Sequence, residues 1–416
     1  MAGAWLGVAL SLDKGAETYV AKIYHWQYAV LVEHDEREIG VKNDLDRYFR
    51  FLQFSLGLSD GEDFLSGEDL VGFDWDSFFR FAKKQALVGV AFDGVKRLSK
   101  DAAPSQDLLM TWFGLCQRIK RRNVILNEAT AEIYERIKAE GFRCCILKGQ
   151  GNALMYPNPN ARTSGDVDVW VNASREETRR LATVLAKDNG YVGKESLNHI
   201  EMSVNGIAVE LHSTPAILNN PLYNRRLQRW LKRNADLQCG NVVSLPDGAG
   251  DVAVPTDAFN VIYQLFHLYH HYLYEGIGLR QFVDYFFVVG GASKSSPDSL
   301  SAGALDEVLR RDLKRLGLWK FAGAVMYVLH EVFGLAESRM LVPIDEKRGG
   351  LLLEEILQGG NFGHHGEKDH GGSMTWRHNV YRLQKDWKLM RYYPSECLAE
   401  PFYRLWHFFW RCFRNK

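Results

Sequence analysis

Two aspartates with the spacing of a metal site lie near the middle of the chain. Asp166 and Asp168 are two residues apart in an otherwise apolar, β-branched run, GDVDVWV. If this run is a strand, both carboxylates project from the same face. Two like charges held together on a buried strand are costly unless a cation lies between them. The pair therefore indicates a bound divalent metal ion.

A third carboxylate, Glu210, lies in a later strand-like run, IAVELHS, which can pair beside the first. Three carboxylates can hold two magnesium ions, because magnesium prefers hard oxygen ligands and keeps several waters. Two such ions can clamp the attacking and leaving oxygens of a phosphoryl or nucleotidyl transfer. Upstream, Lys148 and Gly149 open a loop to Gly165 that supplies a cation and backbone amides suited to a triphosphate.

The elements that must position these residues form a compact α/β unit over about 140–215. The run FRCCIL at 142–147 is short, apolar and bounded by glycines, which predicts a buried strand ahead of the GDVDVWV strand. Ser174 and Glu177 form a capping box that opens a helix. The Asn-Gly pair at 205–206 separates two strand-like runs and predicts a tight hairpin, with Glu210 on its second arm.

Helical patterns flank this unit on both sides. Apolar residues three and four apart predict helices over about 44–138, with Asp74 as a cap and a long helix at 106–139. Helices resume with Thr256 as a cap and continue to the end of the chain. A glycine- and histidine-rich loop at 359–372 interrupts them and is a candidate lid.

The composition is that of a globular protein without a strong field. The chain has 416 residues, 46% hydrophobic and 25% charged, with 51 basic and 51 acidic residues. Zero net charge gives no support for nucleic-acid binding. Six cysteines without a CxxC pair predict reduced thiols. No signal peptide or membrane span is expected from the first 15 residues, so a cytoplasmic location is predicted.

The C-terminal stretch PFYRLWHFFWRCFRNK is aromatic and basic at helical spacing. A helix docked on the core of the protein is the favoured interpretation. A peripheral helix on a membrane surface is the alternative.

The order LKG, loop, YP…R…GDVDVWV, VELH and GIGLRQ…D resembles the uncharacterised bacterial nucleotidyltransferase family of the DNA polymerase beta superfamily. The resemblance covers about 140–290. The superfamily combines a Gly-[Gly/Ser] turn, a spacer, Asp-x-[Asp/Glu] and a later carboxylate. Here the turn is Gly149-Gln150, and Gln150 departs from the usual Gly or Ser. The spacer is also long.

The resemblance implies transfer of a nucleoside monophosphate from an NTP, with ATP the expected donor, and release of pyrophosphate. It assigns the three carboxylates to two magnesium ions and gives Glu210 a role in orienting or deprotonating the acceptor hydroxyl. The residues expected to bind the nucleotide are Lys148, Gly149, Gln150, Arg162, Gly165, Arg280 and Asp284. Of these, Lys148 and Arg162 would meet phosphate charge, and Arg280 would reach the nucleotide with Asp284 orienting it.

The fold class implied is α+β, with a small polymerase-beta-like nucleotidyltransferase core between helical regions. The predicted parts are a weakly structured segment at 1–40, a helical region at 41–139, the α/β core at 140–250 and a helical C-terminal domain at 251–416.

Several residues also have plainer interpretations. Arg280 and Asp284 are four apart and could form only an intrahelical ion pair. The spacing of His267, His270 and His271 permits zinc binding, but the surrounding tyrosines and leucines favour packed histidines. His212 shares the face of Glu210 and could assist it.

Two other functions compete with nucleotidyl transfer. A non-catalytic nucleotide sensor or adaptor could keep the same fold. A glycosyltransferase also uses Asp-x-Asp, but it needs a doubly wound α/β domain ahead of the motif. The acceptor stays open between a small molecule, a sugar phosphate, a protein side chain and a tRNA end.

Overall fold

The structure is a computed structural model that describes residues 34–58, 70–187, 190–292, 299–360, 385 and 387–414. The chain divides into two compact units, 1–51 and 52–416. Helix α2 (His34–Ser55) begins inside the segment predicted to be weakly structured. Most of the predicted lid, 361–372, lies outside the described residues. The sheet and the candidate site belong to the second unit.

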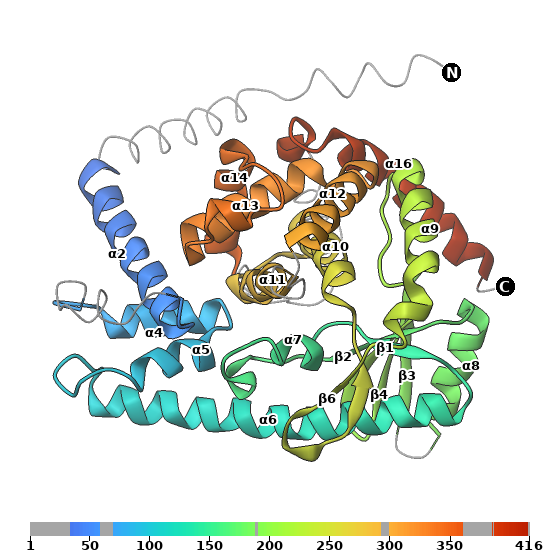
Figure 1. The fold of residues 1–416 in the computed structure, drawn as a ribbon, viewed down its shortest axis with the longest axis horizontal. Helices are drawn as coiled ribbons and strands as arrows, with labels where there is room; N and C mark the ends of the chain where they lie inside the picture. The colour runs from blue at the N-terminus through green and yellow to red at the C-terminus, as the bar shows by residue number, and fades with distance from the viewer. Residues whose placement is uncertain are drawn as a thin grey trace, which may run out of the picture. The chain divides into compact units, whose positions relative to one another are not determined.

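A five-stranded mixed sheet with the order β1-β2-β5-β4-β3 forms the core (Figure 1). Its strands are β1 (Cys144–Ile146), β2 (Val167–Val171), β3 (Gly190–Glu195), β4 (His199–Val204) and β5 (Ile207–His212). Strand β2 runs antiparallel to β1 and parallel to β5. The α+β fold class predicted from the sequence is confirmed, as are the strands that carry Asp168 and Glu210. Asp166, which was predicted on the same strand as Asp168, lies one residue ahead of β2.

The hairpin between β4 and β5 sets the register of the sheet. Asn205 and Gly206 have φ angles of 50° and 77°, the left-handed values that a two-residue hairpin turn of this type requires. The turn pairs His199 with His212, and β2 places Asp168 opposite Glu210. The predicted hairpin is confirmed, and it delivers Glu210 beside the Asp-x-Asp strand.

The two faces of β2 meet different parts of the protein. Val167, Val169 and Val171 belong to a core shared with α6 (Gln106–Ala139) and α8 (Arg175–Leu185). On the other face, Trp170 stacks on Phe259, with ring centroids 5.8 Å apart. This alternation places Asp168 on the face toward Phe259 and the C-terminal helices, as the period of a strand requires.

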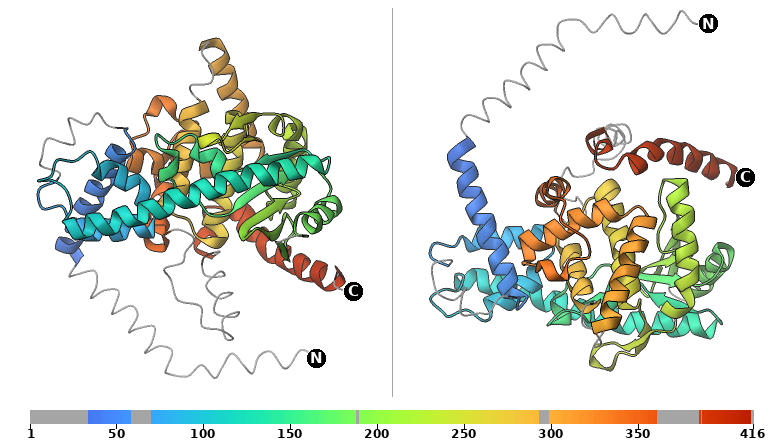
Figure 2. Two further views of the ribbon diagram at one scale, coloured as in Figure 1. Left: turned by 90° about the horizontal axis from the view of Figure 1, so that it is seen from below. Right: turned by 45° about the horizontal axis from the view of Figure 1, so that its top comes forward.

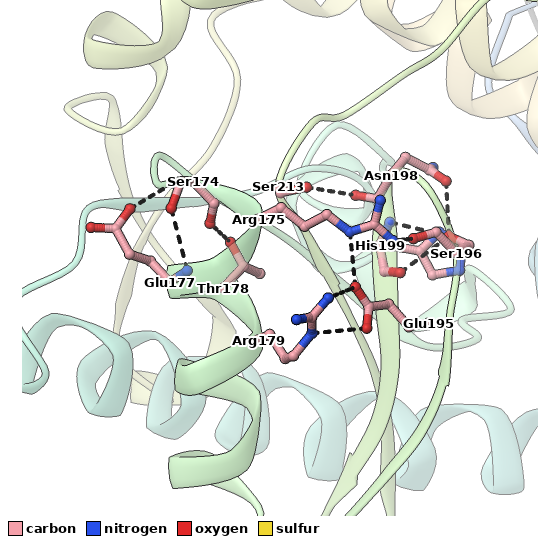
Figure 3. A network of polar contacts seen from close by, with 10 residues as sticks. All are labelled: Ser174, Arg175, Glu177, Thr178, Arg179, Glu195, Ser196, Asn198, His199 and Ser213. Carbon is pink, nitrogen blue, oxygen red and sulfur yellow. Dashed lines mark hydrogen bonds and ion pairs between the residues drawn. The ribbon is translucent and has the colours of Figure 1, made fainter. Parts of the chain in front are cut away.

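Helix α8 is fixed to the sheet at its N-terminus (Figure 3). The capping box predicted at Ser174 and Glu177 is present, with each side chain accepting from the other residue's backbone N–H. Arg175 and Arg179 both donate to Glu195 at the end of β3 (Figure 3). These bonds join the helix to the outer strand.

Helices α4 (Trp75–Lys84) and α5 (Val88–Val95) precede α6, and Asp74 caps α4 as predicted, accepting from the Ser77 N–H at 2.9 Å. The loop between β1 and β2 contains α7 (Gln150–Ala153) and the 3-10 turn η1 (Pro159–Ala161). An added Cβ at Gly89 in α5 would overlap the backbone oxygen of Ala161. The helical region therefore packs directly on this loop.

After the sheet, the chain continues through helices and one small hairpin. These elements are α9 (Pro221–Gln238), β6 (Val242–Ser244), η2 (Pro246–Gly248), β7 (Asp251–Ala253), α10 (Asp257–His270), the π-helix η3 (His271–Glu275), α11 (Leu279–Ala292), α12 (Ser299–Arg315), α13 (Trp319–Phe333), η4 (Glu337–Arg339), α14 (Glu346–Gly359) and α16 (Pro394–Arg414). The β6–β7 hairpin spans the core boundary predicted at 250. Across the described residues, no helix has the length and apolarity needed to span a membrane.

The capping hydrogen bond predicted for the Thr256 side chain is absent. Thr256 does stand at the N-cap position of α10. The hydroxyl instead donates to Oε1 of Gln238 at 3.1 Å, and the backbone N–H donates to the same oxygen at 2.7 Å. A long-range partner from α9 has therefore replaced the local cap.

Candidate active site

The chain turns from β1 into the site at Gly149, whose φ of 54° is in the left-handed region. An added Cβ there would lie 3.5 Å from the backbone oxygen of Asp166, so the turn passes close to the start of β2. Lys148, Gly149 and Gly165 all line one cavity of about 830 Å³ together with the three carboxylates. The predicted loop thus begins and ends at the wall of the same cavity.

The three carboxylates come together as predicted. One oxygen from each of Asp166, Asp168 and Glu210 lies within 4.8 Å of the others. This geometry follows from the parallel pairing of β2 with β5, which sets Asp168 directly opposite Glu210. Asp168 is buried, Glu210 is half-buried and Asp166 is exposed. Hard oxygen donors at this spacing fit a divalent cation.

A lysine and a histidine already contact the buried member of the trio. Lys148 Nζ lies 2.9 Å from Oδ1 of Asp168, and His212 Nε2 lies 3.0 Å from the same oxygen. Burial alone would raise the pKa of Asp168, but these two partners bring it below its usual range. Burial alone would lower the pKa of Lys148, yet Asp168 raises it. The lysine is therefore a permanent cation in the site.

Asp166 responds in the opposite direction. The charge of Asp168, followed by partial desolvation at the cavity wall, raises the pKa of Asp166 to about 6. Lys148 opposes this shift but does not cancel it. The two aspartates thus differ in charge state near pH 6. A divalent ion would relieve the repulsion between them, which is the fit expected of a metal site.

Two histidines flank Glu210. His212 Nε2 lies 3.3 Å from one oxygen of Glu210, and His199 Nε2 lies 3.7 Å from the other. Burial lowers the pKa of His199 to about 4, whereas hydrogen bonds to Asp168 and Glu210 outweigh burial and raise the pKa of His212. Together with Glu210, the two rings form a second group of ligand atoms within 4.8 Å of one another.

His199 was not among the site residues predicted from the sequence. The signal was present, because a two-residue turn at Asn205 and Gly206 pairs each residue of β4 with the residue of β5 that is equally far from the turn. Counting outward from the turn pairs His199 with His212.

Arg162 and Asp284 form a buried bidentate pair. Nε and Nη2 of Arg162 donate to the two carboxylate oxygens at 2.8 and 2.7 Å, and the Tyr156 hydroxyl donates to Oδ1 at 2.6 Å. Asp284, predicted to orient Arg280, is therefore also the partner of Arg162 and Tyr156. Arg280 Nη1 donates to the backbone oxygen of Thr163 at 2.9 Å. Both arginines therefore fix the loop ahead of Asp166 and also line the cavity.

Gln150 points away from the predicted triphosphate. Its side chain is buried, and its amide donates to the side chain of Asn127 and, at 3.5 Å, to the backbone oxygen of Asn123 on α6. Asn123 in turn donates to the backbone oxygens of Asn160 and Arg162. The unusual residue at the turn thus belongs to an amide network that holds the loop against α6.

The opposite wall of the cavity comes from α10, the π-helix and α16. The two carboxylate oxygens of Glu275 contact two histidines of this wall: Oε1 lies 3.2 Å from Nε2 of His270, and Oε2 lies 3.0 Å from Nδ1 of His271. Burial lowers the pKa of His267 well below its usual value. Of the three histidines predicted to pack among apolar residues, His271 is buried, His267 is half-buried and His270 is exposed, so the prediction is wrong for His270. All three line the cavity. π-Helical turns of this kind recur at functional sites.

Residues 72–334 match a family described as uncharacterised nucleotidyltransferase. This match spans more than half of the chain, so the chain belongs to that family.

Among solved structures, an antigenic nucleotidyltransferase-like protein from Paracoccidioides brasiliensis is similar at 18% identity and a TM-score of 0.28. The similarity covers 46% of this chain and 92% of that one. No curated protein matches the chain.

Proposed function

We propose that the protein is a magnesium-dependent nucleotidyltransferase that moves a nucleoside monophosphate from an NTP, with ATP the expected donor, to a hydroxyl of an acceptor. The observation that carries the proposal is the register that pairs Asp168 with Glu210 on neighbouring parallel strands. This register brings three carboxylates within 4.8 Å at the wall of a large cavity. Membership of the nucleotidyltransferase family supports the reaction class.

Asp166, Asp168 and Glu210 are the residues that would hold magnesium. Bound there, the ions would neutralise the charge that develops on the phosphate oxygens. Lys148 stays cationic through its contact with Asp168 and lines the cavity, so its ammonium group can meet a phosphate. Gly149 and Gly165 leave room for the triphosphate beside it. Phosphate binding by Arg162 stays a prediction, because Asp284 already neutralises its charge.

In this reaction the acceptor oxygen attacks the α-phosphorus. A bond forms between that oxygen and phosphorus as the bond to the pyrophosphate oxygen breaks. The hydroxyl proton passes to Glu210 and then to solvent. His212 holds Glu210 in place through its 3.3 Å contact and connects it to Asp168.

The test is pyrophosphate release from each of the four NTPs with magnesium, with a cell extract as the source of acceptor. Asp166→Asn removes one ligand at an exposed position, so the fold should survive the change. Glu132→Gln, at an exposed position on α6, is the matched control. Release by the wild type and the control but not by Asp166→Asn supports the proposal. Release by all three proteins contradicts the assigned site.

Nucleotide sensing without turnover is the alternative, and Gln150 is the feature in its favour, since its side chain faces α6 and not the cavity. Magnesium-dependent NTP binding without pyrophosphate release would support the sensor. The glycosyltransferase alternative loses its basis, because the described elements ahead of β1 are the helices α2, α4, α5 and α6, with no strand among them.

A further inference from the structure

Helix α16 turns an apolar face to solvent. The residues of this face are Leu398, Phe402, Leu405, Trp406 and Phe409, whose exposed fractions are 56%, 76%, 56%, 53% and 49%. Their spacing of three and four residues places all five on one side of the helix. Single exposed apolar residues are ordinary on a protein surface, but a continuous stripe of large ones marks an interaction site.

The polar side of the same helix attaches it to the protein. Glu396 and Glu400 are each 2% exposed. Glu396 accepts from the backbone N–H groups of Asn219 at 2.9 Å and Asn220 at 3.3 Å, ahead of α9. A surface helix usually buries its apolar face and exposes its charges, so α16 departs from the usual arrangement at Glu396 and Glu400. Figure 2 shows this helix, in red, at the periphery of the second unit.

The sequence of this segment points to the partner. Between residues 401 and 416 there are seven aromatic residues, four Lys or Arg and no Asp or Glu. The whole chain balances 51 basic against 51 acidic residues, so this positive charge is a local concentration. Aromatic side chains suit the boundary between headgroups and acyl chains, and Lys and Arg are attracted to anionic headgroups.

We propose that the exposed face of α16 docks on an anionic lipid surface. The net positive charge of the segment argues against a second copy of the chain as the partner, because two such helices would bring like charges together. Glu400, Tyr403 and Arg404 of the same helix line the cavity described above. Docking would therefore bring the lipid surface alongside the wall of that cavity. The proposal does not depend on the reaction assigned to the site.

The test is co-sedimentation of the full chain with phosphatidylcholine vesicles that contain about 30% phosphatidylglycerol, and with pure phosphatidylcholine vesicles. The wild type is expected to bind the anionic vesicles, and about 0.5 M NaCl is expected to weaken binding by screening. Phe402→Ser/Trp406→Ser should bind at least about tenfold more weakly, because it removes two large apolar anchors. Arg411→Gln/Arg414→Gln should weaken binding to the anionic vesicles and should not change the result with pure phosphatidylcholine vesicles.

Met110→Ser/Leu237→Ser is the matched control, since these residues are 65% and 63% exposed on α6 and α9. It should bind as the wild type does. Circular dichroism should show that every variant folds. Equal loss in the control, undiminished binding by Phe402→Ser/Trp406→Ser, or no binding by the wild type would each overturn the proposal. Self-association abolished by Phe402→Ser/Trp406→Ser, without vesicle binding, would identify a second copy as the partner and overturn it too.

Discussion

Replacing Asp284 by Asn should destabilise the protein far more than removing a surface ion pair of the same length. The Asp284 carboxylate accepts from Arg162 twice and from the Tyr156 hydroxyl once, and Arg162 is only 3% exposed. Asn keeps the size of the side chain, but it removes the charge and turns an NH₂ donor toward other donors. A buried guanidinium left without its counter-charge costs about 3–5 kcal/mol.

The matched control is Asp236→Asn. Asp236 pairs with Arg143 at 2.7 Å, the same distance as in the Arg162–Asp284 pair. The side chains of Asp236 and Arg143 are, however, 76% and 55% exposed. An exposed pair is worth about 0–1 kcal/mol. Urea unfolding, followed by circular dichroism, measures the change in the free energy of unfolding for both variants. The comparison isolates burial as the variable.

A double variant completes the design. Arg162→Met/Asp284→Leu leaves no charge behind, so it should be less destabilised than Asp284→Asn alone. If Asp284→Asn costs no more than Asp236→Asn, the buried pair does not stabilise the loop ahead of Asp166. If the double variant is the least stable of the three, the pair contributes more than the avoidance of an unpaired charge, and the reasoning fails.

Three further outcomes follow from other features. The pKa of Asp166 is raised to about 6, and its carboxylate must be ionised to bind a metal. Magnesium affinity measured by calorimetry should therefore fall about tenfold from pH 8 to pH 5. An affinity that does not change with pH would contradict this. Gly89→Ala should lower the free energy of unfolding by about 1–3 kcal/mol, because the new Cβ overlaps the Ala161 oxygen, whereas Gly114→Ala, which meets nothing, should raise it slightly. Burial raises the pKa of Glu396 from 4.5 to about 6, so the folded state favours the protonated form and stability should fall by about 2 kcal/mol as the pH rises through this range. Glu396→Gln should remove that slope from urea unfolding measured between pH 4 and pH 7, and an unchanged slope would assign it to another group.

The parts of the fold that were predictable depend on short-range patterns. The Asn205-Gly206 turn determined the hairpin and its register, and the alternation of Asp166 and Asp168 with valines determined which face carries the carboxylates. Capping by Ser174 also followed from local spacing. In each case the physical cause lies within a few residues of the chain.

The parts that could not be predicted depend on partners far away in sequence. Arg162 and Asp284 are 122 residues apart, and no local pattern distinguishes a phosphate-binding arginine from one already paired. Thr256 had the sequence of a cap, but Gln238 supplied a competing acceptor. Amphipathic spacing in α16 was visible, yet the pattern does not say which face is attached to the protein.

Helix α6 has a consequence for how the protein can be divided. Its 34 residues span about 51 Å without a break. Trp112, in its first half, donates to the Val88 oxygen of α5, whereas Arg136, near its end, donates to the Leu185 oxygen of α8. A fragment that begins at residue 140 would leave the sheet without this support and expose its apolar face. The family match begins at residue 72, but Leu52 and Phe54 are buried and Gln53 donates to the Val332 oxygen of α13 at 3.0 Å. A fragment that starts at residue 72 would lose these contacts, so we expect that the smallest fragment able to fold begins ahead of residue 52.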